Sequence, residues 1–172
     1  MANLLKLPFP GGPSIDRLSQ GGNPKAIPFP RAWMRGTYDF SFSGLKTAVA
    51  NYLRANTNGH RPRLSDVCAS FQEAVVDVLV RKTLEAAQAC RLRSVVVGGG
   101  VAANRRLRAA FQAEARDQKL QVFLPDVAFC TDNAAMIAAG GYFKLKILGR
   151  RHRHLKTLNV DANLPVKSWR AA

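Results

Sequence analysis

The feature that most constrains the fold is an apolar run that changes abruptly into three glycines and then into a helix-forming segment, within residues 94–108. Consecutive valines end at Val97, and Gly98 opens the glycine run. Valine favours buried strands, and glycine lets the backbone approach a ligand closely. Because the amides at a helix start favour anions, the pattern predicts an α/β protein that contacts a ribose or phosphate, with Asn104 as a side-chain donor and acceptor.

Two other interpretations of the glycine loop stay open. Residues 98–103 satisfy the dinucleotide pattern G-x-G-x-x-A, which requires an acid at the end of the next strand, about 20 residues further on. Asp117 lies within the expected helix, and Asp126 comes after the expected strand, so this pattern is matched poorly. The second interpretation is purely structural, since glycine also allows a helix to pack closely against a strand.

Hydrophobic periodicity predicts the order of the elements. Ser65 is a plausible N-cap for the longest helix. Residues 1–36 are rich in proline and glycine, and residues 38–43 alternate as an extended segment or strand would. We expect helices at residues 13–20, 44–54, 65–90, 104–118 and 133–145, and strands at residues 92–97 and 120–124. The alternation over residues 92–145 predicts a βαβα unit with parallel strands, the first of them buried on both faces.

The charge balance points to a polyanionic partner. The chain has 26 lysines and arginines against 11 acids, a net charge of +15. Such a field attracts nucleic acid, although a basic surface that serves only solubility is the alternative. Two arginine clusters are the candidate contacts; they comprise Arg105, Arg106 and Arg108, and Arg150, Arg151 and Arg153.

The three cysteines and the lack of a long apolar run bear on location. Cys68, Cys90 and Cys130 are widely spaced and odd in number, which favours reduced thiols in the cytoplasm over a disulfide framework. No run approaches the roughly 20 apolar residues that cross a bilayer. We therefore expect a cytoplasmic protein without a membrane partner.

A second chemical landmark places Asp132 at the start of the helix expected at residues 133–145. An aspartate there is most often a cap, but Thr131 serves equally well and would leave Asp132 free to bind a ligand. A complete metal site needs three or more protein ligands. Because His152 and His154 lie among arginines, we interpret that histidine pair as solvated surface.

Five motifs, taken in their order along the chain, resemble those of one protein family. They cover residues 10–16, 39–47, 70–74, 99–104 and 130–133, and residues 158–165 are similar to the family's ending. The set resembles the carboxyl-terminal half of the tRNA N6-adenosine threonylcarbamoyltransferases, formerly named O-sialoglycoprotein endopeptidases. The resemblance covers nearly the whole chain.

The resemblance implies an α/β fold of the actin/Hsp70-like ATPase type, with only the second lobe present and a helical N-terminal segment. Residues 1–172 would form a single truncated lobe. Within it, residues 1–91 would be a Pro/Gly-rich and helical segment facing the substrate. Residues 92–172 would form the βαβα nucleotide-binding segment and a basic tail.

The same resemblance implies transfer of threonylcarbamoyl from threonylcarbamoyl-adenylate to N6 of adenosine 37, in tRNAs that read codons beginning with A. Carried over by motif, Gly12, Asp16 and Asn104 would contact the adenylate, and Asp132 would be one ligand of a divalent metal. That metal is expected to be iron, with zinc as the alternative. No catalytic residue is assigned.

The departures from the family pattern are as informative as the matches. The family's other metal ligands are two histidines in an H-x-x-x-H motif of the first lobe, and that motif is absent here, as is the serine-glycine-glycine substrate loop. The resemblance therefore implies a chain that is inactive alone and needs a first lobe or a complementing chain. Its other expected partners are tRNA, an actin-like paralogue and a small ATPase.

Two further functions stay open at this point. The charge is compatible with a non-catalytic basic RNA-binding module. The glycine loop is compatible with a generic nucleotide-binding lobe of a sugar-kinase-like protein.

Overall fold

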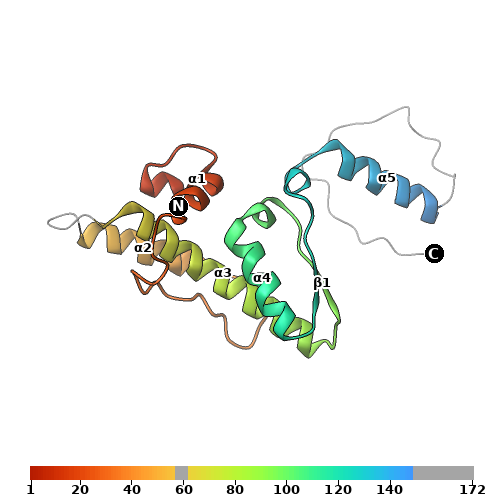
Figure 1. Cartoon of the computed structure of the whole chain (residues 1–172), viewed down its shortest axis with the longest axis horizontal. Helices are drawn as coiled ribbons and strands as arrows, with labels where there is room; N and C mark the ends of the chain where they lie inside the picture. The colour runs from red at the N-terminus through yellow and green to blue at the C-terminus, as the bar shows by residue number, and fades with distance from the viewer. Residues whose placement is uncertain (57–61, 149–172) are drawn as a thin grey trace. The chain divides into compact units, whose positions relative to one another are not determined.

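The computed structural model describes residues 1–56 and 62–148, and it divides the chain into two compact units, Met1–Cys130 and Thr131–Ala172 (Figure 1). The division falls after Cys130, whereas the sequence placed an internal boundary after residue 91. The organisation of both units as one truncated lobe stays a prediction. The arginines at residues 150–153, the histidines and the ending at residues 158–165 lie outside the described residues.

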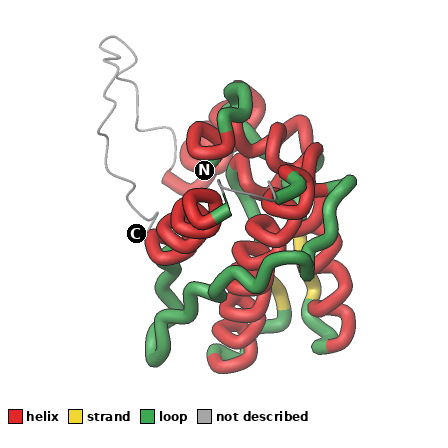
Figure 2. The backbone as a smooth tube through the Cα atoms, turned by 90° about the vertical axis from the view of Figure 1, so that its left-hand side faces the viewer, coloured by secondary structure: helices red, strands yellow, loops and turns green. Residues whose placement is uncertain are grey.

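The first unit is built mostly from helices, as Figure 2 shows. Its elements are η1 (Ala2–Leu5), α1 (Gly11–Ser19), α2 (Ser43–Ala55), α3 (Leu64–Ala89), β1 (Ser94–Val96), η2 (Gly100–Ala103), α4 (Arg105–Asp117), β2 (Gln121–Phe123) and η3 (Val127–Phe129). The four longer helices match those expected, with ends that differ by at most two residues. Residues 38–42 form a loop and pair with no described strand.

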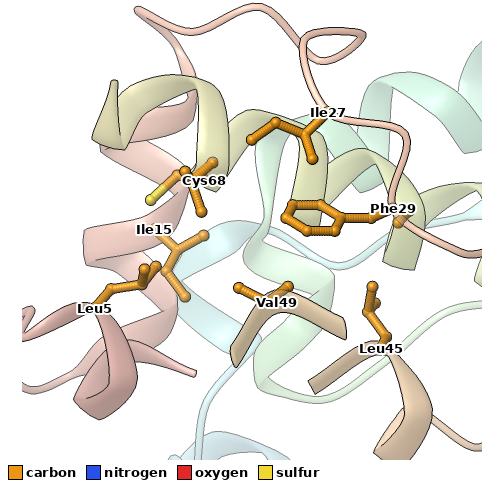
Figure 3. Close-up of a cluster of buried hydrophobic side chains, with 9 residues drawn as sticks. Leu5, Ile15, Ile27, Phe29, Leu45, Val49 and Cys68 are labelled. Carbon is orange, nitrogen blue, oxygen red and sulfur yellow. The ribbon is translucent and has the colours of Figure 1, made fainter. Parts of the chain in front are cut away.

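Helix α3 organises this unit because its two halves belong to different cores. With a rise of about 1.5 Å per residue, its 26 residues span about 39 Å. The N-terminal half packs on η1, α1, α2 and the segment between the last two; this core consists of Leu5, Ile15, Ile27, Phe29, Leu45, Val49, Val67, Cys68 and Ala74 (Figure 3). The C-terminal half packs on α4; this core consists of Val76, Val80, Leu84, Leu107, Ala110, Phe111 and Ala115.

The N-cap predicted for α3 is wrong. The helix begins at Leu64 after Arg63, so Ser65 lies in the first turn, where its buried hydroxyl has no hydrogen-bond partner among the described residues. The neighbouring Asp66 instead accepts a hydrogen bond from the backbone N–H of Asn23 at 2.8 Å. This bond ties the loop after α1 to the start of α3.

Strands β1 and β2 confirm the predicted parallel pairing. Ser94 pairs with Gln121, and the register continues to Val96 and Phe123. The predicted burial of the first strand on both faces is wrong, because Val96 is 77% exposed. Side chains alternate between the faces of a strand, and α4 covers only the face that carries Val122. No described element covers the other face.

The second unit is described from Thr131 to residue 148 and contains helix α5 (Ala134–Leu148). The helix extends three residues beyond its expected end and continues through Gly140 and Gly141. Large apolar side chains along it are exposed, including Ile137 and Tyr142. Across the described ranges, we find no helix with the length and apolar character needed to span a membrane.

Candidate functional site

Helices α1, α3 and α4 bring the predicted site residues of the first unit together. We call this place the junction; it consists of Asp16 on α1, Gln72 and Glu73 on α3, and Asn104, Arg105 and Arg106 at the start of α4. Four of these side chains come from three of the sequence motifs, and Arg105 and Arg106 directly follow the last of those motifs. Asp16, Gln72, Asn104 and Arg105 form one hydrogen-bond network, and Glu73 and Arg106 form a separate ion pair beside it in the chain.

The glycine loop places Asn104 at the start of α4. Gly99 has φ 86° and ψ 172°, a backbone conformation that is almost restricted to glycine. Its carbonyl accepts a hydrogen bond from Ala102 N–H at 2.9 Å, and the Val101 carbonyl accepts one from Asn104 N–H at 3.0 Å. The turn therefore leads from β1 through η2 directly to the N-cap position of α4.

Asn104 is the centre of the network. Its Oδ1 accepts a hydrogen bond from Leu107 N–H at 2.9 Å, which caps α4. Its Nδ2 donates to Asp16 Oδ1 at 3.2 Å and to Gln72 Oε1 at 2.7 Å. Both amide hydrogens are therefore used, and the side chain retains one acceptor lone pair on Oδ1 for a ligand.

The capping bond also fixes the orientation of Gln72. Because the Leu107 N–H requires an oxygen, Asn104 must present its amino group to Gln72, which then accepts with Oε1. The Nε2 donors of Gln72 have no acceptor among the described residues. Gln72 lies in the motif at residues 70–74, but no sequence pattern gives it a role; its contact with Asn104 identifies it.

Asp16 joins α1 to the start of α4. Its side chain is 14% exposed, and Oδ2 accepts a hydrogen bond from Arg105 Nε at 3.0 Å. Each carboxylate oxygen is used once by the protein and has further lone pairs. Asp16 is therefore a partly buried acceptor that can take additional hydrogen bonds.

The arginine cluster predicted to bind nucleic acid is engaged within the protein. Arg106 Nε and Nη2 donate to the two oxygens of Glu73 at 2.7 and 2.6 Å. This hydrogen bonding raises the pKa of Arg106, while burial acts in the opposite direction. Arg105 is paired with Asp16, and Arg108 donates to the Ala102 carbonyl at 2.9 Å. All three arginines therefore make contacts within the protein, while the Arg105 side chain stays 63% exposed, and their role in binding nucleic acid stays a prediction.

A pocket of about 150 Å³ adjoins the junction. It is lined by Gly12, Ile15, Phe71, Gln72, Val75, Val76, Leu79, Val101, Asn104 and Leu107. A side-chain Cβ at Gly12 would meet nothing within 4 Å, so the glycine leaves the pocket open and no packing contact requires it. Sites for whole small ligands have volumes of about 300–1,000 Å³, so this pocket suits one part of such a ligand.

Asp132 lies in the second unit, and its side chain is exposed. The cap of α5 is neither Asp132 nor Thr131, because Asn133 Oδ1 accepts the hydrogen bond from Met136 N–H at 2.9 Å. The carboxylate is therefore not used as a cap, although the cap is Asn133 and neither of the two residues expected from the sequence. Its placement beside the pocket stays a prediction.

An exposed carboxylate is a suitable oxygen ligand for a divalent cation, but it is a single ligand. Within residues 1–56 and 62–148, no three histidine, cysteine, aspartate or glutamate side chains gather as a metal site would require. The described residues therefore do not form a complete metal site, and we derive no chemical step through a metal.

One family model and three curated relatives of the chain carry the same name. The family model for tRNA N6-adenosine threonylcarbamoyltransferase matches residues 1–139. Proteins of this name are 53% identical over 169 residues in Geobacillus thermodenitrificans (96% of this chain, 48% of that protein) and 43% identical over 169 residues in Endomicrobium trichonymphae (98% and 49%). In Desulfotalea psychrophila the identity is 52% over 149 residues (84% and 43%).

The chain spans about half the length of these curated relatives. The family match includes the residues of the junction and of the pocket, from Gly12 to Leu107, and it also includes Asp132. The chain therefore belongs to the tRNA N6-adenosine threonylcarbamoyltransferase family.

Proposed function

We propose that this chain forms one wall of the adenylate site of a tRNA-modifying transferase. The enzyme transfers threonylcarbamoyl from threonylcarbamoyl-adenylate to N6 of adenosine 37, in tRNAs that read codons beginning with A. The observation that carries the proposal is that Gly12 and Asn104 line one pocket and that Asn104 is hydrogen-bonded to Asp16. Their role in binding comes from the family resemblance.

The chemistry of the junction suits a nucleoside. Asp16 and Asn104 each offer an acceptor, which matches the two hydroxyl donors of a ribose. The apolar side chains of Phe71 and Val101 line the pocket and suit the face of a base. Gln72 Nε2 supplies donors to a group that enters the pocket.

In the proposed reaction, the N6 nitrogen forms a bond with the carbamoyl carbon and loses a proton. The bond between that carbon and the phosphate oxygen breaks, and AMP leaves. Because AMP is a good leaving group, orientation of the two substrates contributes most of what the site must supply. Asp16 and Asn104 orient the adenylate, and no described residue is assigned as the base.

We also propose that Asp132 is one ligand of a divalent metal, iron or alternatively zinc, whose remaining ligands come from a first lobe or a complementing chain. When bound, such an ion would stabilise charge that develops on the transferred group. The fold expected for this arrangement is the second lobe of an actin/Hsp70-like ATPase. We expect it to operate in the cytoplasm, with the actin-like and ATPase partners that the family resemblance implies.

A non-catalytic RNA-binding module is the second candidate, because the net charge is +15. The two candidates share tRNA binding and differ in adenylate chemistry. A sugar-kinase-like lobe is less well supported, since the family match covers the greater part of the chain.

The test is a complementation assay. The chain is mixed with the half of the Geobacillus thermodenitrificans relative that it does not match, together with threonylcarbamoyl-adenylate, iron and tRNA. Nucleoside mass spectrometry should detect threonylcarbamoyladenosine only when both polypeptides are present, and D132A should abolish it. No product, or undiminished product with D132A and N104D, would contradict the proposed function. Product from this chain alone would contradict its dependence on a second part.

A further inference from the structure

Helices α3 and α4 end in the same backbone arrangement, immediately before the two strands. Leu92 N–H donates to the Ala87 carbonyl at 2.8 Å, and Leu120 N–H donates to the Ala115 carbonyl at 2.9 Å. These bonds define two Schellman motifs. The residue between helix and strand is left-handed in each, with φ 53° at Arg91 and φ 54° at Lys119.

The residues at these two positions are unusual for the conformation. A Schellman motif most often has glycine there, because a side chain disfavours the left-handed region. Here both positions carry exposed cations, and exposed Arg93 and Arg116 lie two residues after Arg91 and three residues before Lys119. We call the set of Arg91, Arg93, Arg116 and Lys119 the basic edge.

The two turns that carry the basic edge are hydrogen-bonded to each other. Gln121 N–H donates to the Arg93 carbonyl at 3.0 Å, and Gln88 Nε2 donates to Gln118 Oε1 at 3.0 Å. The parallel register then begins with Ser94 opposite Gln121. The cations are therefore held on two neighbouring, mutually bonded turns.

The charges of the basic edge are not neutralised. In the described part of the chain, none of the four cations forms an ion pair, and Asp117 is the one acid within the two turns, residues 90–93 and 116–119. A cation at a helix C-terminus gains from the helix dipole, but for each residue this gain is no larger than the cost of the left-handed conformation, so the dipole alone does not account for this choice of residues.

We propose that the basic edge binds the phosphate backbone of RNA. Four exposed cations on rigid turns, in a chain of net charge +15, complement a regular row of phosphates. The edge lies where the strands begin, and α4, which is about 20 Å long, separates it from Asn104. The inference rests on the proposed function in taking tRNA as the RNA, and it places a contact away from the adenylate pocket.

The test replaces the two left-handed cations with glycine, the residue that this conformation favours. R91G/K119G should therefore fold at least as stably as the unaltered chain. If both side chains contact phosphates, tRNA affinity at about 0.1 M salt should fall about tenfold. The slope of log affinity against log salt should decrease in magnitude by about 1.4–1.8.

Lys6 provides a matched control. It is also an exposed lysine with φ 54°, but it follows η1, which packs against the N-terminal half of α3. K6G removes the same charge from the same backbone conformation as K119G. We expect K6G to leave the salt slope unchanged and K119G to reduce it by about 0.7–0.9.

Cys90 reports the location of binding. It is exposed at the end of α3, whereas Cys68 and Cys130 are buried, and burial raises the pKa of Cys68 to about 11. Bound tRNA should slow alkylation of Cys90 by a bulky maleimide, and R91G/K119G should lose this protection. tRNA binding with an unchanged slope and no protection of Cys90 would overturn the basic edge and leave the proposed function intact. No binding at low salt by the unaltered chain would contradict both.

Discussion

The junction and the basic edge are both rich in charge and stand at opposite ends of α4, but their charges are used differently. At the junction, Arg105 and Arg106 are paired with Asp16 and Glu73. At the basic edge, the cations are exposed and form no ion pair among the described residues. The first arrangement positions polar atoms around a pocket, and the second leaves positive charge available to a partner.

The comparison teaches that contiguity in sequence is a poor guide to available charge. Arg105, Arg106 and Arg108 are nearly consecutive because they belong to one helix start, where neighbouring carboxylates and carbonyls meet them. Arg91 and Lys119 are far apart in the sequence, and parallel strand pairing brings their turns together. The contacts of each cation, and not its position in a sequence cluster, therefore show whether its charge is available to a partner.

The largest effect is expected at the centre of the junction. N104A removes the helix cap, worth about 1 kcal/mol, and two side-chain hydrogen bonds, each worth about 0.5–1.5 kcal/mol. We expect the free energy of unfolding in urea to fall by about 2–3 kcal/mol. N104S retains a capping oxygen without placing a second carboxylate beside Asp16, and it should lose less. Equal losses for the two variants would contradict the capping role.

An intermediate effect is expected for the ion pair of the junction. E73Q retains the shape of the side chain but weakens a bidentate bond to Arg106, and it should destabilise the fold by about 1 kcal/mol.

The smallest effect is expected at the basic edge, where R116Q should change stability by less than about 0.5 kcal/mol. Urea unfolding measures both variants. A larger loss for R116Q than for E73Q would reverse the comparison.

The sequence predicted the helices well because helical periodicity is local. It failed where the outcome depends on distant parts of the chain, as at Val96, whose expected cover is not supplied by any described element. Capping was also ambiguous, because Thr131, Asp132 and Asn133 are all good caps and only the geometry selects Asn133.

For the candidate site, the motifs predicted Gly12 and Asn104, which line one pocket, and Asp16, which is hydrogen-bonded to Asn104. The role of Gln72 depends on a contact that no pattern reveals. No sequence pattern predicted the burial of a lysine either. Lys82 is 4% exposed and donates to the carbonyls of Met34 and Asp39 at 3.0 and 2.7 Å. The ammonium group holds the loop that contains Met34 and Asp39, whereas lysine is usually found on the surface of a protein.

The most direct measurement of the central claim is a titration of the chain with a non-reactive analogue of threonylcarbamoyl-adenylate, followed by nuclear magnetic resonance. The side-chain amide signals of Asn104 and Gln72 and the backbone amide of Gly12 should shift together. G12A, which fills the pocket without a clash, should weaken binding about tenfold and leave the fold intact. Binding that leaves these signals unmoved, or that G12A does not change, would contradict an adenylate wall at the junction.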